Sequence, residues 1–252
     1  MISPHPIVGI IGGMGPEATV DLMRRVIAAT PAQDDVDHIH MIVDNNPKIP
    51  SRIAALIDGT GESPAPELCR MAIGLENSGA TFIAIPCNTA HAYLEDVRGA
   101  VQIPVLDMPR LTAAYLQAII LTRRVVGVLA STAVVKIKHY DRVLGEVGLK
   151  AYYPEDQTGL MAVIRGVKRG DTGLANRNRF RQIAQDLFAT GCDVLLIACT
   201  ELSVLADALD GSLPMTDAMD VLANEIVRLA TQGKQQKIST HSLAVATDQS
   251  RI

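Results

Sequence analysis

The sequence predicts an α/β fold with mostly parallel sheets, and three observations support this prediction. Short runs of β-branched and aliphatic residues alternate with longer segments of helical periodicity. Apolar residues make up 48% of the 252 residues, which is enough for a large core and too many for a disordered chain. Two strand-and-loop segments of the first half recur in altered form in the second half. Such alternation is typical of parallel strands joined by crossover helices.

The first half of the chain begins with a buried strand and a glycine-rich turn. Residues 7–11 predict the strand, and a helix is expected to begin at Pro16, because proline favours the first helical position. The elements expected after this helix are a strand at 38–43, a mostly looped segment at 44–66, a helix at 66–78, a strand at 81–85, a further helix after 87–91 and a strand at 103–106.

The second half repeats the alternation. Its expected elements are a helix at 110–122, a strand at 125–129, a helix at 133–147, a strand at 150–153, two helices within 156–190, a strand at 194–198 and a helix at 221–230. Residues 232–252 are polar and aperiodic, which predicts a flexible C-terminal tail.

Charge and hydropathy exclude several classes of partner. The chain has 23 Lys and Arg against 27 Asp and Glu, a net charge of −4, which argues against nucleic acid or an anionic membrane as a partner. No apolar run approaches the roughly 20 residues of a membrane span. The N-terminus lacks the basic flank and apolar core of a signal peptide. We therefore expect a soluble, cytoplasmic protein.

The four cysteines, Cys69, Cys87, Cys192 and Cys199, form no C-x-x-C pair. A reducing compartment argues against disulfides, and the spacing of cysteines and histidines does not fit a zinc site. We therefore expect no metal, and each cysteine is either a core residue or a reactive thiol. Cys69 lies in a helical stripe and Cys192 just precedes a strand, so both are expected in the core.

The internal repeat places two cysteines in equivalent positions. Residues 7–11 resemble 125–129, and residues 82–89 resemble 194–201. Buried parallel strands resemble one another in any case, since both of their faces are apolar. The repeated cysteine is harder to explain in this way. Cys87 and Cys199 each follow a strand end and precede a helix, where α/β folds bind their ligands. Two halves facing each other would place them on opposite walls of one cleft.

Two opposed thiols suit inversion of a carbon centre. One thiolate removes a proton from one face, and the opposing thiol returns a proton from behind. A single nucleophilic cysteine would instead need a base. His91 lies four residues after Cys87, but Cys199 is followed by Glu201 and has no nearby histidine. Backbone N–H groups of 12–15, at a helix start, are expected to bind the carboxylate of the anionic intermediate.

Four segments in order resemble the aspartate/glutamate racemase superfamily, most closely its aspartate racemase branch, over about residues 7–230. They are Ile10–Pro16, Asn45–Arg52, Pro86–His91 and Ala198–Glu201. The resemblance implies a racemase without cofactor that interconverts L- and D-aspartate by two-cysteine proton transfer, and it names glutamate as a further candidate substrate. It also implies two pseudo-symmetric α/β lobes with the active site in the cleft between them, and a homodimer. We expect the lobes to comprise 1–108 plus 213–231, and 109–212.

The resemblance also implies roles for single residues. Cys87 and Cys199 match the acid/base thiols, and Arg52 and Lys168 match positions that bind the side-chain carboxylate of the substrate. The other expected substrate contacts are Met14, Gly15, Asn88, Thr89, Ser131, Thr132, Thr200 and Glu201. As an alternative, Arg52 and Lys168 are ordinary solvated cations. Glu201 stands where glutamate racemases carry a histidine, which favours the aspartate branch.

Other functions fit the same pattern. One alternative is an isomerase or decarboxylase of a small dicarboxylate, similar to maleate isomerase. A second is a racemase of broad specificity, and a third is a binding protein for small acids that catalyses nothing. Retention of both cysteines together with both cations favours the aspartate racemase.

Overall fold

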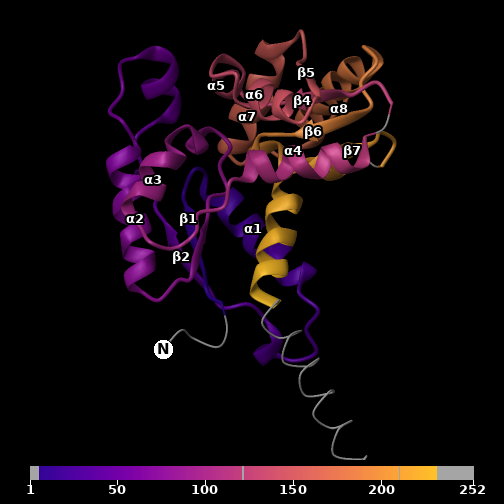
Figure 1. Ribbon diagram of the computed structural model, residues 1–252. Coiled ribbons are helices and arrows are strands. Elements are labelled where there is room, and N and C mark those ends of the chain that lie inside the picture. The colour runs from indigo at the N-terminus through magenta and orange to yellow at the C-terminus, as the bar shows by residue number, and fades with distance from the viewer. Residues whose placement is uncertain (1–5, 121, 210, 232–252) are drawn as a thin grey trace, which may run out of the picture.

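The computed structural model describes residues 6–120, 122–209 and 211–231, which form two α/β lobes (Figure 1). The sheet of the first lobe has the order β2-β1-β3, and every pair in it is parallel. Its strands are β1 (Val8–Gly12), β2 (Met41–Asn45) and β3 (Phe82–Ala84). The predicted α/β class is therefore confirmed for this lobe.

The second sheet is also parallel and has the order β5-β4-β6-β7. Its strands are β4 (Val125–Leu129), β5 (Lys150–Tyr152), β6 (Val194–Ile197) and β7 (Met215–Asp217). The repeated segments take equivalent places in the two sheets, because β1 and β4 are each flanked by the next strand along the chain and by the strand that precedes a cysteine. The sequence repeat thus corresponds to a structural repeat.

The fourth strand position differs between the lobes. In the first lobe, the strand expected at 103–106 is reduced to one bridge between Val105 and Ile83. In the second lobe, the same position holds β7, which the sequence pattern did not predict. Because β7 pairs with β6, residues 215–217 belong to the second sheet, although we expected 213–231 to join the first lobe. The other boundaries expected for the two lobes remain a proposal.

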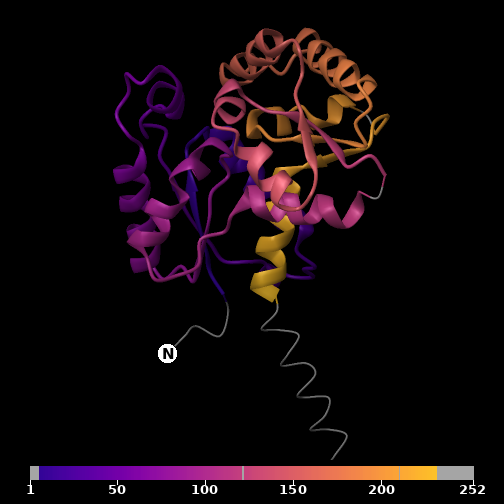
Figure 2. The same cartoon turned by 45° about the horizontal axis from the view of Figure 1, so that its top comes forward.

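Helices flank both sheets (Figure 2). They are α1 (Pro16–Ala29), α2 (Ala65–Asn77), α3 (Leu94–Ala100), α4 (Met108–Ile119), α5 (Thr132–Lys136), α6 (His139–Glu146), α7 (Gln157–Lys168), α8 (Leu174–Ala189), α9 (Thr200–Ser203) and a helical segment at 218–231. Short helical turns occupy Asp35–Asp37, Ala54–Asp58, Thr89–Tyr93 and Ala206–Leu209. The single helix predicted at 133–147 is wrong, because Lys138 adopts a left-handed conformation (φ 51°) that separates α5 from α6.

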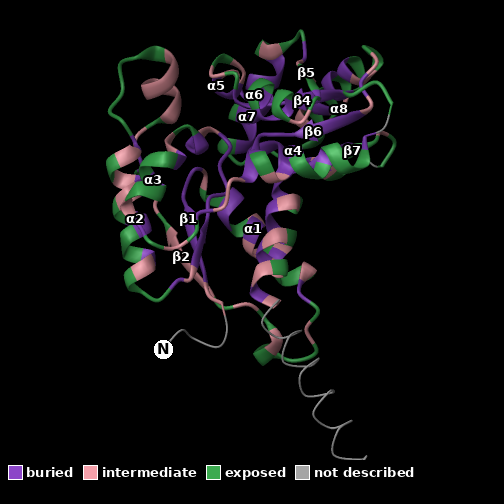
Figure 3. Cartoon of the chain, viewed as in Figure 1, coloured by how far each residue is buried: buried purple, intermediate pink, exposed green. Residues whose placement is uncertain are grey.

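One hydrophobic cluster joins the two lobes. Alternate residues of a strand point to opposite faces of its sheet. In β1, Ile10 packs in the shared cluster and Ile11 packs beneath α2; in β4, Val128 packs in the shared cluster and Leu129 packs beneath α7 and α8. Helices α1, α4, α5 and α6 and the segment 218–231 also contribute residues to the shared cluster. The strands β1, β3, β4 and β6 are buried along their whole length, within both lobes (Figure 3). The shared core fixes the position of the carboxyl ends of one sheet relative to those of the other.

Two sequence expectations concern solubility and the C-terminus. In the described ranges, no helix is long and apolar enough to cross a bilayer. The tail predicted at 232–252 lies outside the described residues.

Candidate active site

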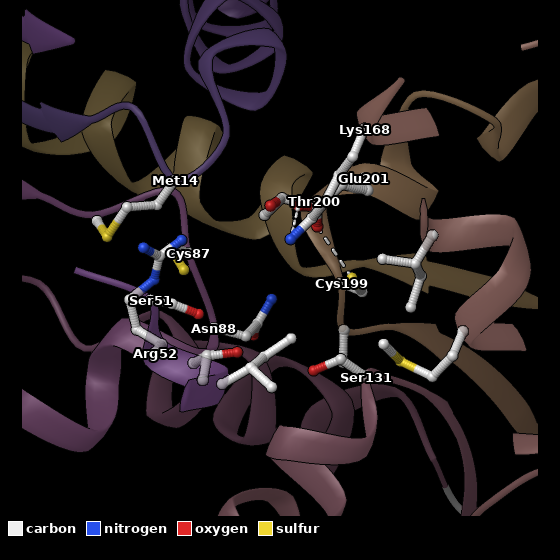
Figure 4. A pocket seen from close by; sticks show the side chains of 15 residues that line it. Met14, Ser51, Arg52, Cys87, Asn88, Ser131, Lys168, Cys199, Thr200 and Glu201 are labelled. Atoms are coloured by element: carbon white, nitrogen blue, oxygen red, sulfur yellow. Dashed lines mark hydrogen bonds and ion pairs between the residues drawn. The ribbon is translucent and has the colours of Figure 1, made fainter. Parts of the chain in front are cut away.

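A cavity of about 60 Å³ lies between the carboxyl ends of the two sheets, with Cys87 and Cys199 on opposite sides of it (Figure 4). Both thiols are almost fully buried, with 6% and 7% of their residue surface exposed. Cys87 follows β3 in the first lobe and Cys199 follows β6 in the second. Equivalent loops of the two repeats therefore supply the two thiols.

The loop after β3 positions Cys87 through its backbone. The Cys87 N–H donates to the carbonyl oxygen of Ile85 at 2.8 Å. His91 Nδ1 lies 2.9 Å from the Cys87 carbonyl oxygen, and His91 Nε2 lies 3.1 Å from the Met108 amide nitrogen, from which it accepts a hydrogen bond. His91 is therefore neutral and carries its proton on Nδ1, and burial also lowers its pKa. It braces the cysteine loop against α4 and makes no hydrogen bond to the thiol.

Cys199 forms a charged chain with two residues of the second lobe. The Cys199 thiol donates to Glu201 Oε2 at 3.1 Å, and Lys168 Nζ lies 3.2 Å from Glu201 Oε1 (Figure 4). Glu201 is almost buried, whereas the side chain of Lys168 is 44% exposed. Burial acts to lower the pKa of Lys168, but the neighbouring Glu201 and the cysteines raise it overall. Lys168 therefore stands as a cation that already has an anionic partner.

Burial in this cavity raises the pKa of both thiols. For Cys87, Arg52 and Lys168 oppose the effect and Glu201 adds to it. For Cys199, the pKa rises well above its ordinary value, because Glu201 adds both its charge and its hydrogen bond while Lys168 opposes them. The two thiols thus occupy equivalent positions in different electrostatic environments.

The first lobe contributes a cation and an amide on the side of Cys87. Arg52 Nη1 donates to the carbonyl oxygens of Ile49 at 3.4 Å and Pro50 at 3.1 Å, and its buried Nε has no hydrogen-bond partner. Within the described residues, Arg52 makes no ion pair with a carboxylate. Asn88 accepts a hydrogen bond at Oδ1 from the buried Tyr140 hydroxyl at 2.6 Å, which leaves its buried Nδ2 without a partner. Both groups can donate to an anionic ligand in the cavity.

The cavity brings together most of the residues predicted from the sequence. Those that line it are Met14, Arg52, Cys87, Asn88, Thr89, Ser131, Lys168, Cys199, Thr200 and Glu201. Two predicted contacts lie elsewhere. Gly15 lines an adjoining cavity of about 250 Å³ that shares Met14, Arg52, Lys168 and Glu201 with the first. The residues lining the cysteine cavity do not include Thr132, whose N–H points to the sulfur of Met161 at 3.4 Å.

The glycine turn offers fewer free donors than expected. The Gly13 N–H donates to Thr19 Oγ1 at 2.9 Å and is not available to a ligand. Gly13 has φ +93°, and a Cβ there would lie 2.1 Å from the carbonyl oxygen of Asn46. Only glycine therefore fits at this position, where the turn packs closely against the loop that leads to Arg52.

Sequence reasoning missed five residues that line the cavity: Ser51, Ile53, Met161, Ile164 and Ala198. Ser51 lies within Asn45–Arg52, one of the four segments that resemble the racemase superfamily. Met161 and Ile164 lie seven and four residues before Lys168 on α7, and this helical spacing places all three on one face. That spacing is the signal that could have found them.

The remaining cysteines lie away from the cavity. Cys192 packs in the core of the second lobe, whereas Cys69 is only partly buried on α2. Among the residues with described positions, no group of three or more His, Cys, Asp or Glu side chains is arranged to hold a metal ion. The chemistry that the cavity itself offers is proton transfer by two thiols between cationic and amide donors.

Comparisons with known proteins agree with this arrangement. Residues 11–226 match the family described as Asp/Glu/hydantoin racemase. The broad specificity amino-acid racemase RacX of Bacillus subtilis is 26% identical over 226 residues, which are 88% of this chain and 96% of that protein. The aspartate racemase of Picrophilus torridus is 32% identical, with a TM-score of 0.81 over 89% of this chain and 94% of that one.

An aspartate racemase homologue from Pyrococcus horikoshii shares the fold, with a TM-score of 0.72 and 23% identity over 89% of this chain and 99% of that one. Its low identity supports the architecture alone. The family match covers most of the chain, and the structural likeness extends across both lobes. The chain therefore belongs to the Asp/Glu/hydantoin racemase family and is an amino-acid racemase of its PLP-independent kind.

Proposed function

We propose that this racemase interconverts L- and D-aspartate by proton transfer between Cys87 and Cys199. The observation that carries the proposal is Arg52, a cation that lines the thiol cavity and makes no ion pair with a carboxylate of the described residues. A guanidinium at this position favours a substrate whose side chain ends in a carboxylate. Glutamate carries the same group on a side chain longer by one methylene and is the nearest second substrate.

The proton transfer needs one thiolate and one thiol. The Cys87 thiolate takes the Cα proton from one face and becomes a thiol, and the electron pair left on carbon delocalises into the α-carboxylate. The Cys199 thiol then donates its proton to the opposite face and becomes the thiolate. In the reverse direction the two cysteines exchange roles. Asn88 Nδ2, which has no partner within the described residues, is suited to bind the α-carboxylate of the substrate.

A racemase of broad specificity is the second candidate, and a specific observation favours it. The adjoining cavity of about 250 Å³ opens beside Arg52 and offers room for side chains larger than that of aspartate. Lys168, moreover, is already paired with Glu201 and is less available to a substrate carboxylate. The curated relative from Bacillus subtilis is a racemase of this broad type.

Exchange of the Cα proton in D₂O separates these candidates. Reduced protein without added cofactor is incubated separately with L-aspartate, D-aspartate, L-glutamate and L-alanine; NMR follows deuterium uptake and chiral chromatography follows the other enantiomer. Exchange with inversion for aspartate, with alanine inert, supports the aspartate racemase. Comparable exchange for all of these amino acids supports broad specificity. No exchange, from folded protein with free thiols, contradicts both.

A further arm with maleate tests the dicarboxylate isomerase, since fumarate formed from maleate has a distinct NMR signal. The Cys69→Ser variant serves as a control because Cys69 lies on α2, away from the cavity. We also propose a homodimer in a reducing cytoplasm, where both thiols stay free. Light scattering coupled to gel filtration measures the oligomeric state.

A further inference from the structure

The two thiols have unequal hydrogen-bond partners. Cys199 Sγ donates to a carboxylate oxygen of Glu201 at 3.1 Å. The Cys87 thiol has no hydrogen bond to a side chain within the described residues. The Ala90 N–H, as a donor to the thiolate, and Arg52 both act to lower the pKa of Cys87. The Glu201 N–H does the same at Cys199, so the two cysteines differ in their side-chain partners. The pseudo-symmetry that relates the two cysteine loops therefore does not extend to the groups that hold their protons.

The Cys199–Glu201 hydrogen bond has a definite direction. A carboxylate has no proton to donate, so the shared proton lies on the sulfur. Lys168 Nζ, 3.2 Å from the other oxygen of Glu201, balances the charge of the carboxylate from α7. A thiolate at Cys199 would lose this hydrogen bond and face a like charge at close range. The contact thus stabilises the thiol form of Cys199.

We propose that Glu201 assigns the resting roles of the two cysteines, holding Cys199 as the thiol and leaving Cys87 as the base of the free enzyme. The catalytic meaning of this assignment rests on the proposed two-thiol reaction. Glu201, which we expected to contact substrate, is then a positioning residue that acts through Cys199. Lys168 is its counterion and reduces the effect of its charge on both sulfurs.

The charged and titratable groups around the thiols agree with this assignment. Those that act on Cys199 are Glu201 from α9 and Lys168 from α7, and those that act on Cys87 are Arg52, Glu201 and Lys168. Burial raises the pKa of both thiols, and Glu201 raises that of Cys199 further through its charge and its hydrogen bond. Two cations oppose the shift at Cys87, against one at Cys199.

Alkylation of the free enzyme tests the assignment without any substrate. Iodoacetamide is uncharged and reacts with the thiolate, so the rate at each cysteine reports its thiolate fraction. Mass spectrometry of the tryptic peptides at 71–98 and 182–228 reads Cys87 and Cys199, and fragment spectra separate Cys199 from Cys192 on the second peptide. Because the two thiols are similarly buried, a difference between their alkylation rates reports a difference in thiolate fraction and not in access.

Removing the charge of Glu201 and removing the charge of Lys168 are expected to change the alkylation rate of Cys199 in opposite directions. In the wild type at neutral pH, Cys87 reacts at least about tenfold faster than Cys199, which is one unit of pKa difference. Glu201→Gln speeds alkylation of Cys199 about tenfold and moves its pH midpoint down, with a change of less than about threefold at Cys87. Glu201→Asp keeps a carboxylate and restores slow alkylation. Lys168→Met slows Cys199 further, because it removes the cation that opposes Glu201.

General loosening of the site would speed alkylation in every variant, so the opposite sign for Lys168→Met separates electrostatics from unfolding. Circular dichroism confirms that each variant is folded. The proposal is overturned if Cys199 reacts as fast as Cys87 in the wild type, or if Glu201→Gln leaves Cys199 unchanged. Because no substrate is present, this outcome is independent of the D₂O exchange experiment, which alone decides the proposed racemisation.

Discussion

Arg25 Nη1 lies 3.0 Å from Asp217 Oδ2 and joins α1 of the first lobe to the end of β7 in the second. The same arginine donates from Nη2 to the carbonyl oxygen of Ser203 at 3.2 Å, and the Ser203 hydroxyl donates to Asp217 Oδ1 at 2.8 Å. Ser203 closes α9, the helix that begins directly after Cys199. These contacts fix the second cysteine loop relative to the first lobe.

The pH dependence of stability should report on Asp217. Burial raises its pKa to about 6 although Arg25 opposes the shift. Between about pH 4 and pH 6 the folded protein therefore holds this proton more tightly than the unfolded chain does, and the contribution of Asp217 to the free energy of unfolding falls as pH rises. Asp217→Asn removes this titration. The difference in unfolding free energy between wild type and variant should fall by about 2–3 kcal/mol from pH 4 to pH 7.

Urea unfolding at four pH values across that range measures the difference. Asp220→Asn is the matched control, because Asp220 pairs with the same arginine but its side chain is 58% exposed. The pH dependence of this variant's difference from the wild type should be smaller than that for Asp217→Asn. A constant difference for Asp217→Asn would contradict the assignment of the titration to Asp217.

Loss of either candidate thiol should abolish racemisation. Serine is close in size to cysteine, but its hydroxyl is far too weakly acidic to serve as the base or acid in this step. We expect Cys87→Ser and Cys199→Ser each to lower kcat by at least about 10³-fold while the thermal unfolding midpoint changes little. Cys69→Ser should keep wild-type activity. Chiral chromatography measures the rates, and wild-type turnover by either active-site variant would exclude the two-thiol mechanism.

Removal of the Arg52 guanidinium should discriminate between substrates. Charge-assisted hydrogen bonds contribute about 1.5–3 kcal/mol, so Arg52→Ala should lower kcat/KM for aspartate by about 10- to 100-fold. For alanine, which has no side-chain carboxylate, the loss should stay within about threefold. Arg52→Lys keeps the charge but lacks the planar guanidinium. Its kcat/KM for aspartate should therefore lie between those of the wild type and of Arg52→Ala. Equal losses for aspartate and alanine would remove Arg52 from side-chain recognition.

Tyr140 should act on substrate binding through Asn88. Its hydroxyl donates to Asn88 Oδ1 at 2.6 Å, and both residues are buried. Tyr140→Phe leaves a buried acceptor unsatisfied, which should destabilise the protein by about 1–3 kcal/mol and release the orientation of the amide. We expect KM for aspartate to rise more than kcat falls. Tyr153→Phe is the control, since the Tyr153 hydroxyl donates to the exposed Asp141 at 2.6 Å, away from the cavity. Steady-state kinetics that place the whole effect of Tyr140→Phe in kcat would argue against this role.

Local patterns in the sequence predicted the features that depend on neighbours along the chain. Continuous apolar runs such as 125–129 and 194–198 predicted buried parallel strands, because only such strands are apolar on both faces. Pro16 predicted the start of α1, where the structure places it. Cys87 and Cys199 each follow a strand end, and the internal repeat predicted that two facing halves would place them on opposite walls of one cleft.

Local sequence patterns could not predict the features that depend on packing between distant segments. The short strand β7 forms only because β6 lies beside it, and the chain breaks at Lys138 in a segment whose periodicity reads as one helix. The split helix places Tyr140 behind Asn88, which lies 52 residues earlier in the chain.

By itself, the sequence determined the two α/β repeats and the pair of thiols, because strand burial and strand-end positions follow from residues next to one another. Only the tertiary structure decided that Lys168 pairs with Glu201 and that Glu201 accepts the proton of Cys199. The physical reason is that side-chain charges interact over a few ångströms of space, and the packing of α7 against α9 brings together groups that lie 33 residues apart in the chain.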